Sequence, residues 1–143
     1  EINTAMPQRV VDRTIEALNE VAGRASKGAR ILVLGVAYKK NIEDTRERPA
    51  FRIIELLEKR GVEVSFHDPL VTEIAPSREH AHLGRQTLGE LTQAIVASFD
   101  ATVICTDHDA VDYRRLVEWS PLVIDTRNVC SRQRLTRAHI IKA

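Results

Sequence analysis

Apolar positions follow two different periods along this chain. Between residues 8 and 22 they recur every three or four positions, which predicts an amphipathic helix. The apolar stripe of this helix consists of Val11, Ile15, Leu18 and Ala22. Residues 31–36 then form an unbroken apolar run, as is typical of a strand covered on both faces. Further strands are predicted at 62–67, 101–106 and 122–125, with a short edge strand at 139–141.

Helical patterns separate these strands and indicate the fold class. The predicted helices cover residues 50–57, 88–99 and 111–117, and Gly61 ends the first of them. Strands that alternate with helices favour right-handed crossovers and a parallel sheet. We therefore expect an α/β fold, a Rossmann-like doubly wound parallel sheet preceded by one long helix.

Two of the predicted helices begin beside polar residues that suit a cap. Thr87, with Glu90 three positions later, matches a capping box for the helix at 88–99. Asp109 is expected to cap the helix at 111–117.

Composition narrows the possible partners. The 143 residues fit one domain, and 21 Lys and Arg against 20 Asp and Glu leave a net charge of +1. Without a basic excess, and with 4% aromatic residues, we expect no nucleic-acid partner. No apolar run approaches the ~18 residues that cross a bilayer, so we expect no membrane partner and a cytoplasmic location. The first residue is Glu1 rather than Met, which suggests a fragment of a longer protein.

Polar residues follow the carboxyl ends of the predicted strands, where open parallel sheets bind ligands. Lys39 and Arg46 follow the first strand and Arg127 the fourth, and we expect them to converge into one anion site. Tyr38 adds an aromatic face for a ring, so the set suits a nucleotide diphosphate. On pattern alone, solvated surface charges are an equal alternative. Only Gly35 follows the first strand, without G-x-G-x-x-G, so side chains rather than backbone amides would hold the phosphates.

The turns after the strands carry a set of short motifs. They are Gly35–Lys40, Asp44–Glu47 with Pro49–Ala50, Gly61, His67–Pro69, Thr106–His108 and Asp125–Asn128. Together they closely resemble the C-terminal domain of the UDP-glucose/GDP-mannose dehydrogenase family. Residues 3–7 and 10–11 resemble the end of that family's central helical segment. Each motif alone is weak, whereas the pairing of the first with the last is specific.

This resemblance implies part of an NAD-dependent oxidoreductase that converts the C6 alcohol of a UDP-sugar to a carboxylate. Residues 1–27 would be the end of a central dimerisation helix and its linker, in a homodimer. Residues 28–143 would be the UDP-sugar-binding C-terminal domain, inactive alone. The first motif, followed by residues 42–44, is closer to the UDP-N-acetylhexosamine branch (UDP-GlcNAc or UDP-ManNAc) than to the UDP-glucose branch.

The resemblance also implies roles for single residues. Tyr38, Lys39 and Arg127 match the substrate-binding positions of the family. Arg46 matches an arginine that reaches NAD, which a separate N-terminal domain would bind. The alternatives are a UDP-glucose 6-dehydrogenase domain, a non-catalytic nucleotide-binding or interaction module, and a stand-alone NAD-binding domain.

The remaining candidate residues are expected to have structural roles. Cys105 lies within a predicted strand as a buried apolar residue and Cys130 could be exposed; neither matches the family's catalytic cysteine, so no catalytic residue is assigned. His80 and His82 lack a nearby third ligand, and residues 107–109 are expected to cap a helix and orient a loop, so no metal is assigned.

The apolar stripe of the first helix would be exposed if this chain had no partner. We expect another part of a longer protein, or a second subunit, to cover it.

Overall fold

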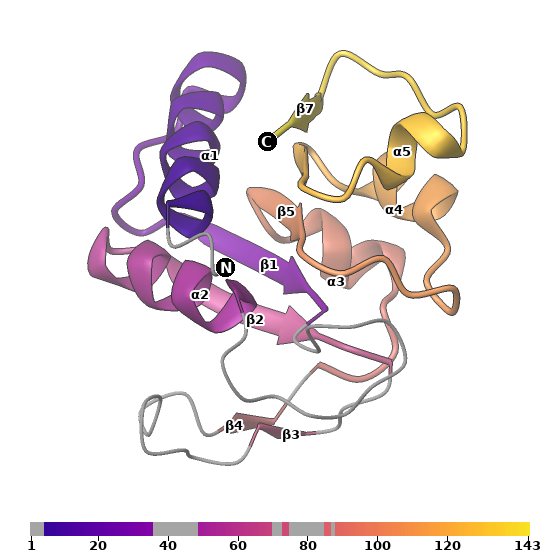
Figure 1. Cartoon of the computed structure of the whole chain (residues 1–143), viewed down its shortest axis with the longest axis horizontal. Helices are drawn as coiled ribbons and strands as arrows, with labels where there is room; N and C mark the ends of the chain where they lie inside the picture. Colours follow the sequence, from indigo (N-terminus) through magenta and orange to yellow (C-terminus); the bar gives the residue numbers. More distant parts are fainter. Residues whose placement is uncertain (1–4, 36–48, 70–72, 75–84, 87) are drawn as a thin grey trace.

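Five parallel strands form one sheet in the described part of the chain (Figure 1). The computed structural model describes residues 5–35, 49–69, 73–74, 85–86 and 88–143. The strands of this sheet, in spatial order, are β2 (Glu63–His67), β1 (Arg30–Leu34), β5 (Ala101–Ile104), β6 (Val123–Asp125) and β7 (Ile140–Lys142). Two short strands, β3 (Glu73–Ile74) and β4 (Arg85–Gln86), pair antiparallel outside it. The predicted parallel sheet and its edge strand are confirmed.

Helices cover both faces of this sheet. They are α1 (Met6–Ala22), α2 (Pro49–Lys59), α3 (Gln93–Ala97), α4 (Tyr113–Trp119) and α5 (Val129–Arg132). Ile31 and Val33 of β1 pack in the core with α1 and α2, whereas Leu32 and Leu34 pack with the other three helices. Because successive side chains of a strand point to opposite faces, this two-sided burial explains the unbroken apolar run in the sequence.

The apolar stripe of α1 is covered by this chain itself. Val11 and Leu18 are fully buried and Ile15 is 8% exposed, in the core that α1 shares with α2 and the sheet. The expectation that another part or a second subunit covers these side chains is wrong, because α1 folds back beside α2 (Figure 1). Among the described residues Val21 is the one large hydrophobic side chain that is exposed. The helices of the described part are all too short or too polar to cross a bilayer.

The predicted caps of α3 and α4 are wrong, and Thr87 itself lies outside the described residues. α3 begins at Gln93, where the Thr92 hydroxyl accepts a hydrogen bond from the Ile95 N–H at 3.2 Å. The Leu88 N–H donates to the Phe66 carbonyl at 2.8 Å, so the chain still runs beside β2 at the predicted start of the helix.

α4 likewise begins later than predicted. It starts at Tyr113, and the Asp112 carboxylate, not Asp109, accepts from the Arg115 N–H at 3.1 Å. The predicted helix starts are therefore five residues too early for α3 and two residues too early for α4.

Strand order places a topological switch point at β1. β1 pairs with β2 on one side and with β5 on the other, so the chain winds outward from it in both directions. In such sheets the loops after the two central strands diverge and leave a crevice at their carboxyl ends. The candidate site therefore lies beyond the ends of β1 and β5, together with the adjacent end of β6.

Candidate functional site

Gly35 directly follows β1, at the edge of the sheet where this fold class is expected to have its crevice. Gly35 has φ +84°, and a Cβ there would lie 2.5 Å from the Thr106 Cβ and 2.9 Å from the Thr106 nitrogen. The Gly35 N–H donates to the His67 carbonyl at 2.8 Å. Glycine is required because the segments after β1 and β5 touch here, and because the backbone is left-handed. This glycine thus serves a contact within the protein.

Asp125 ends β6 and shapes the loop that carries Arg127. Its Oδ1 accepts hydrogen bonds from the N–H groups of Arg127 (3.0 Å) and Val129 (3.3 Å), and its Oδ2 accepts from the Cys130 N–H (2.8 Å). Asn128, between them, has a left-handed φ of 59°, which asparagine tolerates better than most residues. The buried carboxylate satisfies amides at the start of α5, and this explains the Asp125–Asn128 motif.

Arg127 lies on this loop with its side chain half exposed. Its Nε is 3.6 Å from Oδ1 of Asp107, on the loop after β5. The second oxygen of Asp107 accepts a hydrogen bond of 2.7 Å from Nη2 of Arg132. The same Nη2 lies 3.3 Å from the Arg127 carbonyl, which accepts from it. Two guanidinium groups therefore share one carboxylate at the carboxyl edge of the sheet.

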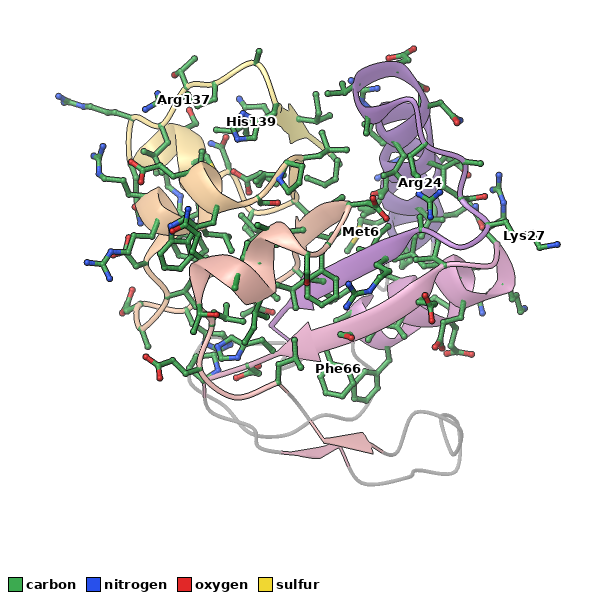
Figure 2. The ribbon with its side chains drawn as sticks, turned by 180° about the vertical axis from the view of Figure 1, so that it is seen from behind. Met6, Arg24, Lys27, Phe66, Arg137 and His139 are labelled. Atoms are coloured by element: carbon green, nitrogen blue, oxygen red, sulfur yellow. The ribbon has the colours of Figure 1, made fainter. Side chains whose placement is uncertain are left out.

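These contacts hold Asp107 ionised. Burial raises its pKa, but the hydrogen bond from Arg132 and the nearby charge of Arg127 outweigh this effect, so the pKa of Asp107 lies below the ordinary 3.8. Asp107 therefore pairs with two arginines, and the buried Asp125 carboxylate lies below the same loop. Arg24 and Lys27, by contrast, lie on the turn between α1 and β1, at the opposite end of that strand (Figure 2).

A buried pair joins two of the sequence motifs. His108 Nε2 lies 3.1 Å from Oδ2 of Asp68, with side-chain exposures of 2% and 0%. The pair connects the turn after β2 to the turn after β5, across the end of β1 between them. Within the described residues, Nδ1 of His108 has no hydrogen-bond partner. His108 orients the loop as expected, but it does not cap α4.

Neither cysteine is poised to act as a nucleophile. Burial raises the pKa of the Cys105 thiol to about 12, although the charge of Arg127 opposes the shift. Burial and the Asp125 carboxylate raise the pKa of Cys130 to about 12 as well. Cys105 is only partly buried, whereas Cys130, expected to be exposed, is 1% exposed because α5 packs over the sheet.

A cavity of about 260 Å³ lies beside the edge, between α3 and α4. It is lined by His67, Glu90, Leu91, Val96, Ala110, Val111, Asp112, Arg115, Leu116 and Trp119. Its charged residues have both signs.

The structure places one of the predicted site residues. Arg127 lies at the carboxyl edge of the sheet, as expected from its position after β6. Tyr38, Lys39 and Arg46 lie outside the described residues, so their convergence with Arg127 stays a prediction. His80 and His82 are outside them too, and the described part contains no group of three potential metal ligands.

Sequence reasoning misses the contribution of Arg132, the ion pairs of Asp107 and the hydrogen bonds by which Asp125 shapes its loop. Arg132 lies on a short helix five residues beyond Arg127, and no spacing rule marks it. Asp107 reads as part of a cap in the sequence because caps and ion pairs use the same residue types.

The residues of this site fall within a known protein domain. The model of the UDP binding domain of the UDP-glucose/GDP-mannose dehydrogenase family matches residues 32–132. This range holds the crevice at Gly35 and the Asp107, Arg127 and Arg132 cluster. The chain belongs to this family. The resemblance seen in the sequence motifs is thereby confirmed, and with it the assignment to the UDP binding domain.

Individual relatives in the family differ in the sugar named. A UDP-N-acetyl-D-mannosamine dehydrogenase of Methanococcus maripaludis is 33% identical over 137 residues, covering 90% of this chain and 29% of the relative. The UDP-glucose 6-dehydrogenase TuaD of Bacillus subtilis is 33% identical over 149 aligned positions, covering 99% of this chain and 30% of the relative.

A solved structure confirms the fold. The UDP-D-ManNAc dehydrogenase of Pyrococcus horikoshii superposes with a TM-score of 0.72 at 28% identity, over 98% of this chain and 31% of that one. The chain therefore spans less than a third of the length of these relatives.

Proposed function

We propose that this chain is the UDP-sugar-binding part of an NAD-dependent nucleotide-sugar 6-dehydrogenase. The longer enzyme would oxidise the C6 alcohol of a UDP-N-acetylhexosamine to the uronic acid. The observation that carries this proposal is the match of the UDP binding domain over residues 32–132. The relatives named as UDP-N-acetyl-D-mannosamine dehydrogenases support the choice of sugar.

In this proposal Arg127 binds the diphosphate of the substrate. A guanidinium donates two parallel hydrogen bonds to phosphate oxygens, and Arg127 stands half exposed on a loop fixed by Asp125. Tyr38 and Lys39 join it, as the family resemblance implies. Binding of the UDP moiety would hold the sugar in place for a reaction elsewhere, because remote contacts offset the cost of orientation.

NAD would accept hydride when bound, and we propose that a separate domain binds most of it. In a dinucleotide loop, glycines let the backbone approach a pyrophosphate. Here Gly35 is occupied by its contact with Thr106, which supports assigning NAD elsewhere. From this chain Arg46 would reach the cofactor. We expect Arg46→Ala to leave UDP affinity unchanged and to lower turnover of the longer enzyme; the reverse pattern would remove Arg46 from the NAD side.

We further propose that residues 1–27 end a central dimerisation segment and that 28–143 form the binding domain. The outward face of α1 is polar apart from Val21 and Ala22, so residues 6–22 offer little apolar area for a subunit interface. The homodimer contact would therefore involve other parts of that segment. Sedimentation of the 143-residue chain should give a monomer, and a stable dimer would contradict the inference that the homodimer contact lies elsewhere.

Turnover tests the proposal. The full-length protein, incubated with NAD and a panel of UDP-sugars, should form two NADH per UDP-GlcNAc or UDP-ManNAc. Preference for UDP-glucose would support the second candidate, which the Bacillus subtilis relative favours. UDP binding without NADH formation would point to a non-catalytic module, and absence of UDP binding would overturn the proposed function altogether.

A further inference from the structure

Asp107 contacts both Arg127 and Arg132 at the carboxyl edge of the sheet, one with each carboxylate oxygen. Oδ1 faces Nε of Arg127 at 3.6 Å, and Oδ2 accepts from Nη2 of Arg132 at 2.7 Å. The Asp107 side chain is 17% exposed, whereas those of the arginines are 49% and 55% exposed. The carboxylate is thus the least accessible member of the cluster and lies beneath the two cations.

The contact with Asp107 uses one edge of the Arg127 guanidinium. Among the described residues, no hydrogen bond or ion pair engages the two terminal nitrogens of Arg127. The backbone below them is fixed, because Asp125 accepts from the Arg127 N–H and Arg132 donates to the Arg127 carbonyl. Asp107 thus faces the Nε side of Arg127 as an ion pair at 3.6 Å, without a hydrogen bond, while the fork of Arg127 remains available to an external oxyanion.

We propose that Asp107 is a positioning residue for Arg127, holding its Nε so that the two terminal nitrogens point to a bound phosphate. Asp107 itself does not touch the ligand. Arg132 occupies the other oxygen of Asp107 and offsets its negative charge. This inference rests on the proposed function, in which Arg127 binds the diphosphate of UDP.

Simple charge counting makes the opposite prediction. A carboxylate close to a diphosphate repels it, so removal of Asp107 would strengthen UDP binding if charge alone mattered. Positioning predicts weaker binding, because an unheld arginine loses more side-chain freedom when the ligand binds. The sign of the change therefore separates the two explanations.

The experiment is a double-mutant cycle on the 143-residue chain, with UDP affinity measured by calorimetry. Asp107→Asn should weaken UDP binding about fivefold, within the usual range for coupled neighbours. In an Arg127→Ala background the same substitution should change affinity less than twofold. Asp107→Glu, which keeps the carboxylate, should restore affinity to within about twofold of the unmodified chain.

Asp100→Asn is the matched control. Asp100 pairs with Arg24 at 3.5 Å and accepts from the Arg30 N–H, at the opposite end of the strands. The Asp100→Asn substitution removes the same charge and a comparable ion pair, and it should leave UDP affinity unchanged. Thermal unfolding of each variant checks that the fold is intact.

A second measurement needs no substitution at Asp107. In a ¹⁵N spectrum of the unmodified chain, the Arg127 Nε–H should give a resolved signal, assigned by its loss in Arg127→Ala. A signal merged with those of free arginine would overturn the proposal, as would equal or tighter UDP binding in Asp107→Asn, or an undiminished effect of that change without Arg127. If instead Arg127→Ala leaves UDP binding intact, the proposed role of Arg127 fails first.

Discussion

Replacement of Gly35 by alanine tests the close contact at the switch point. The added Cβ would lie 2.5 Å from the Thr106 Cβ and 2.9 Å from its backbone nitrogen. Neither neighbour is the flexible end of a side chain, so the segments after β1 and β5 would have to separate. The φ of +84° adds a second cost, because alanine avoids left-handed backbone.

The two costs can be worked out separately with a matched glycine. Gly23 also has a left-handed φ, +61°, but a Cβ added there would have no neighbouring atom within 4 Å. Left-handed backbone costs about 1–2 kcal/mol, partly offset by about 0.4–1 kcal/mol from the stiffer unfolded chain, so Gly23→Ala should cost about 1 kcal/mol. Overpacking adds about 1–3 kcal/mol, so Gly35→Ala should cost about 3 kcal/mol.

Urea unfolding measures both free energies. Fluorescence of Trp119, the one tryptophan of the chain, follows the transition. The slope of the unfolding free energy against urea concentration should be the same for all variants. The urea concentration at the midpoint of unfolding should fall much more for Gly35→Ala than for Gly23→Ala. Equal destabilisation by the two substitutions would refute the packing argument, because backbone strain alone would then account for both.

Three further predictions concern Asp125 and the two cysteines. Asp125→Asn keeps Oδ1 but places an amide N–H₂ against the Cys130 N–H, so it should lower the free energy of unfolding by about 1–3 kcal/mol. Asp125→Ala leaves three backbone amides without an acceptor and should lower it more. Equal stability of the two variants in urea would contradict this. Iodoacetamide should label Cys105 and Cys130 in the folded chain at pH 8 at least ~100-fold more slowly than glutathione, because thiols with a pKa of about 12 are scarcely ionised. Because the pKa of both thiols in the folded chain lies above the ordinary 9.0, the thiols of the unfolded chain ionise first, and the free energy of unfolding should fall as the pH rises from about 9 towards 12. Rapid labelling at pH 8 would contradict the first of these two predictions. A constant free energy of unfolding between pH 9 and 12 would contradict the second.

The sequence predicts the sheet well because burial imposes a pattern on the strands. β1 is buried on both faces and reads as an unbroken apolar run, and the edge strand β7 is short and only partly buried. Caps are harder to predict, since Thr87 and Thr92 both stand shortly before apolar residues and either could begin the helix. The choice depends on how long the chain stays beside β2, which the hydrogen bond from Leu88 to Phe66 decides.

The candidate site is predictable where it depends on a strand end and not where it depends on register. Arg127 follows β6 and reaches the carboxyl edge for that reason alone. Its ion pair with Asp107 requires β5 and β6 to pair with Ile104 opposite Asp125, which brings two loops together. No local pattern in the sequence encodes that alignment, so the role of Asp107 emerges only from the structure.

The most direct test of the central claim is the affinity of the Arg127→Ala chain for UDP. Loss of a charge-assisted contact of about 2 kcal/mol corresponds to a roughly thirtyfold rise in Kd. Arg24→Ala provides the comparison, since Arg24 pairs with Asp100 at 3.5 Å and a similar exposure of 44%, at the far end of the strands. The account predicts about thirtyfold weaker binding for Arg127→Ala and unchanged binding for Arg24→Ala. A folded Arg127→Ala chain that binds UDP as tightly as the unmodified chain would contradict it.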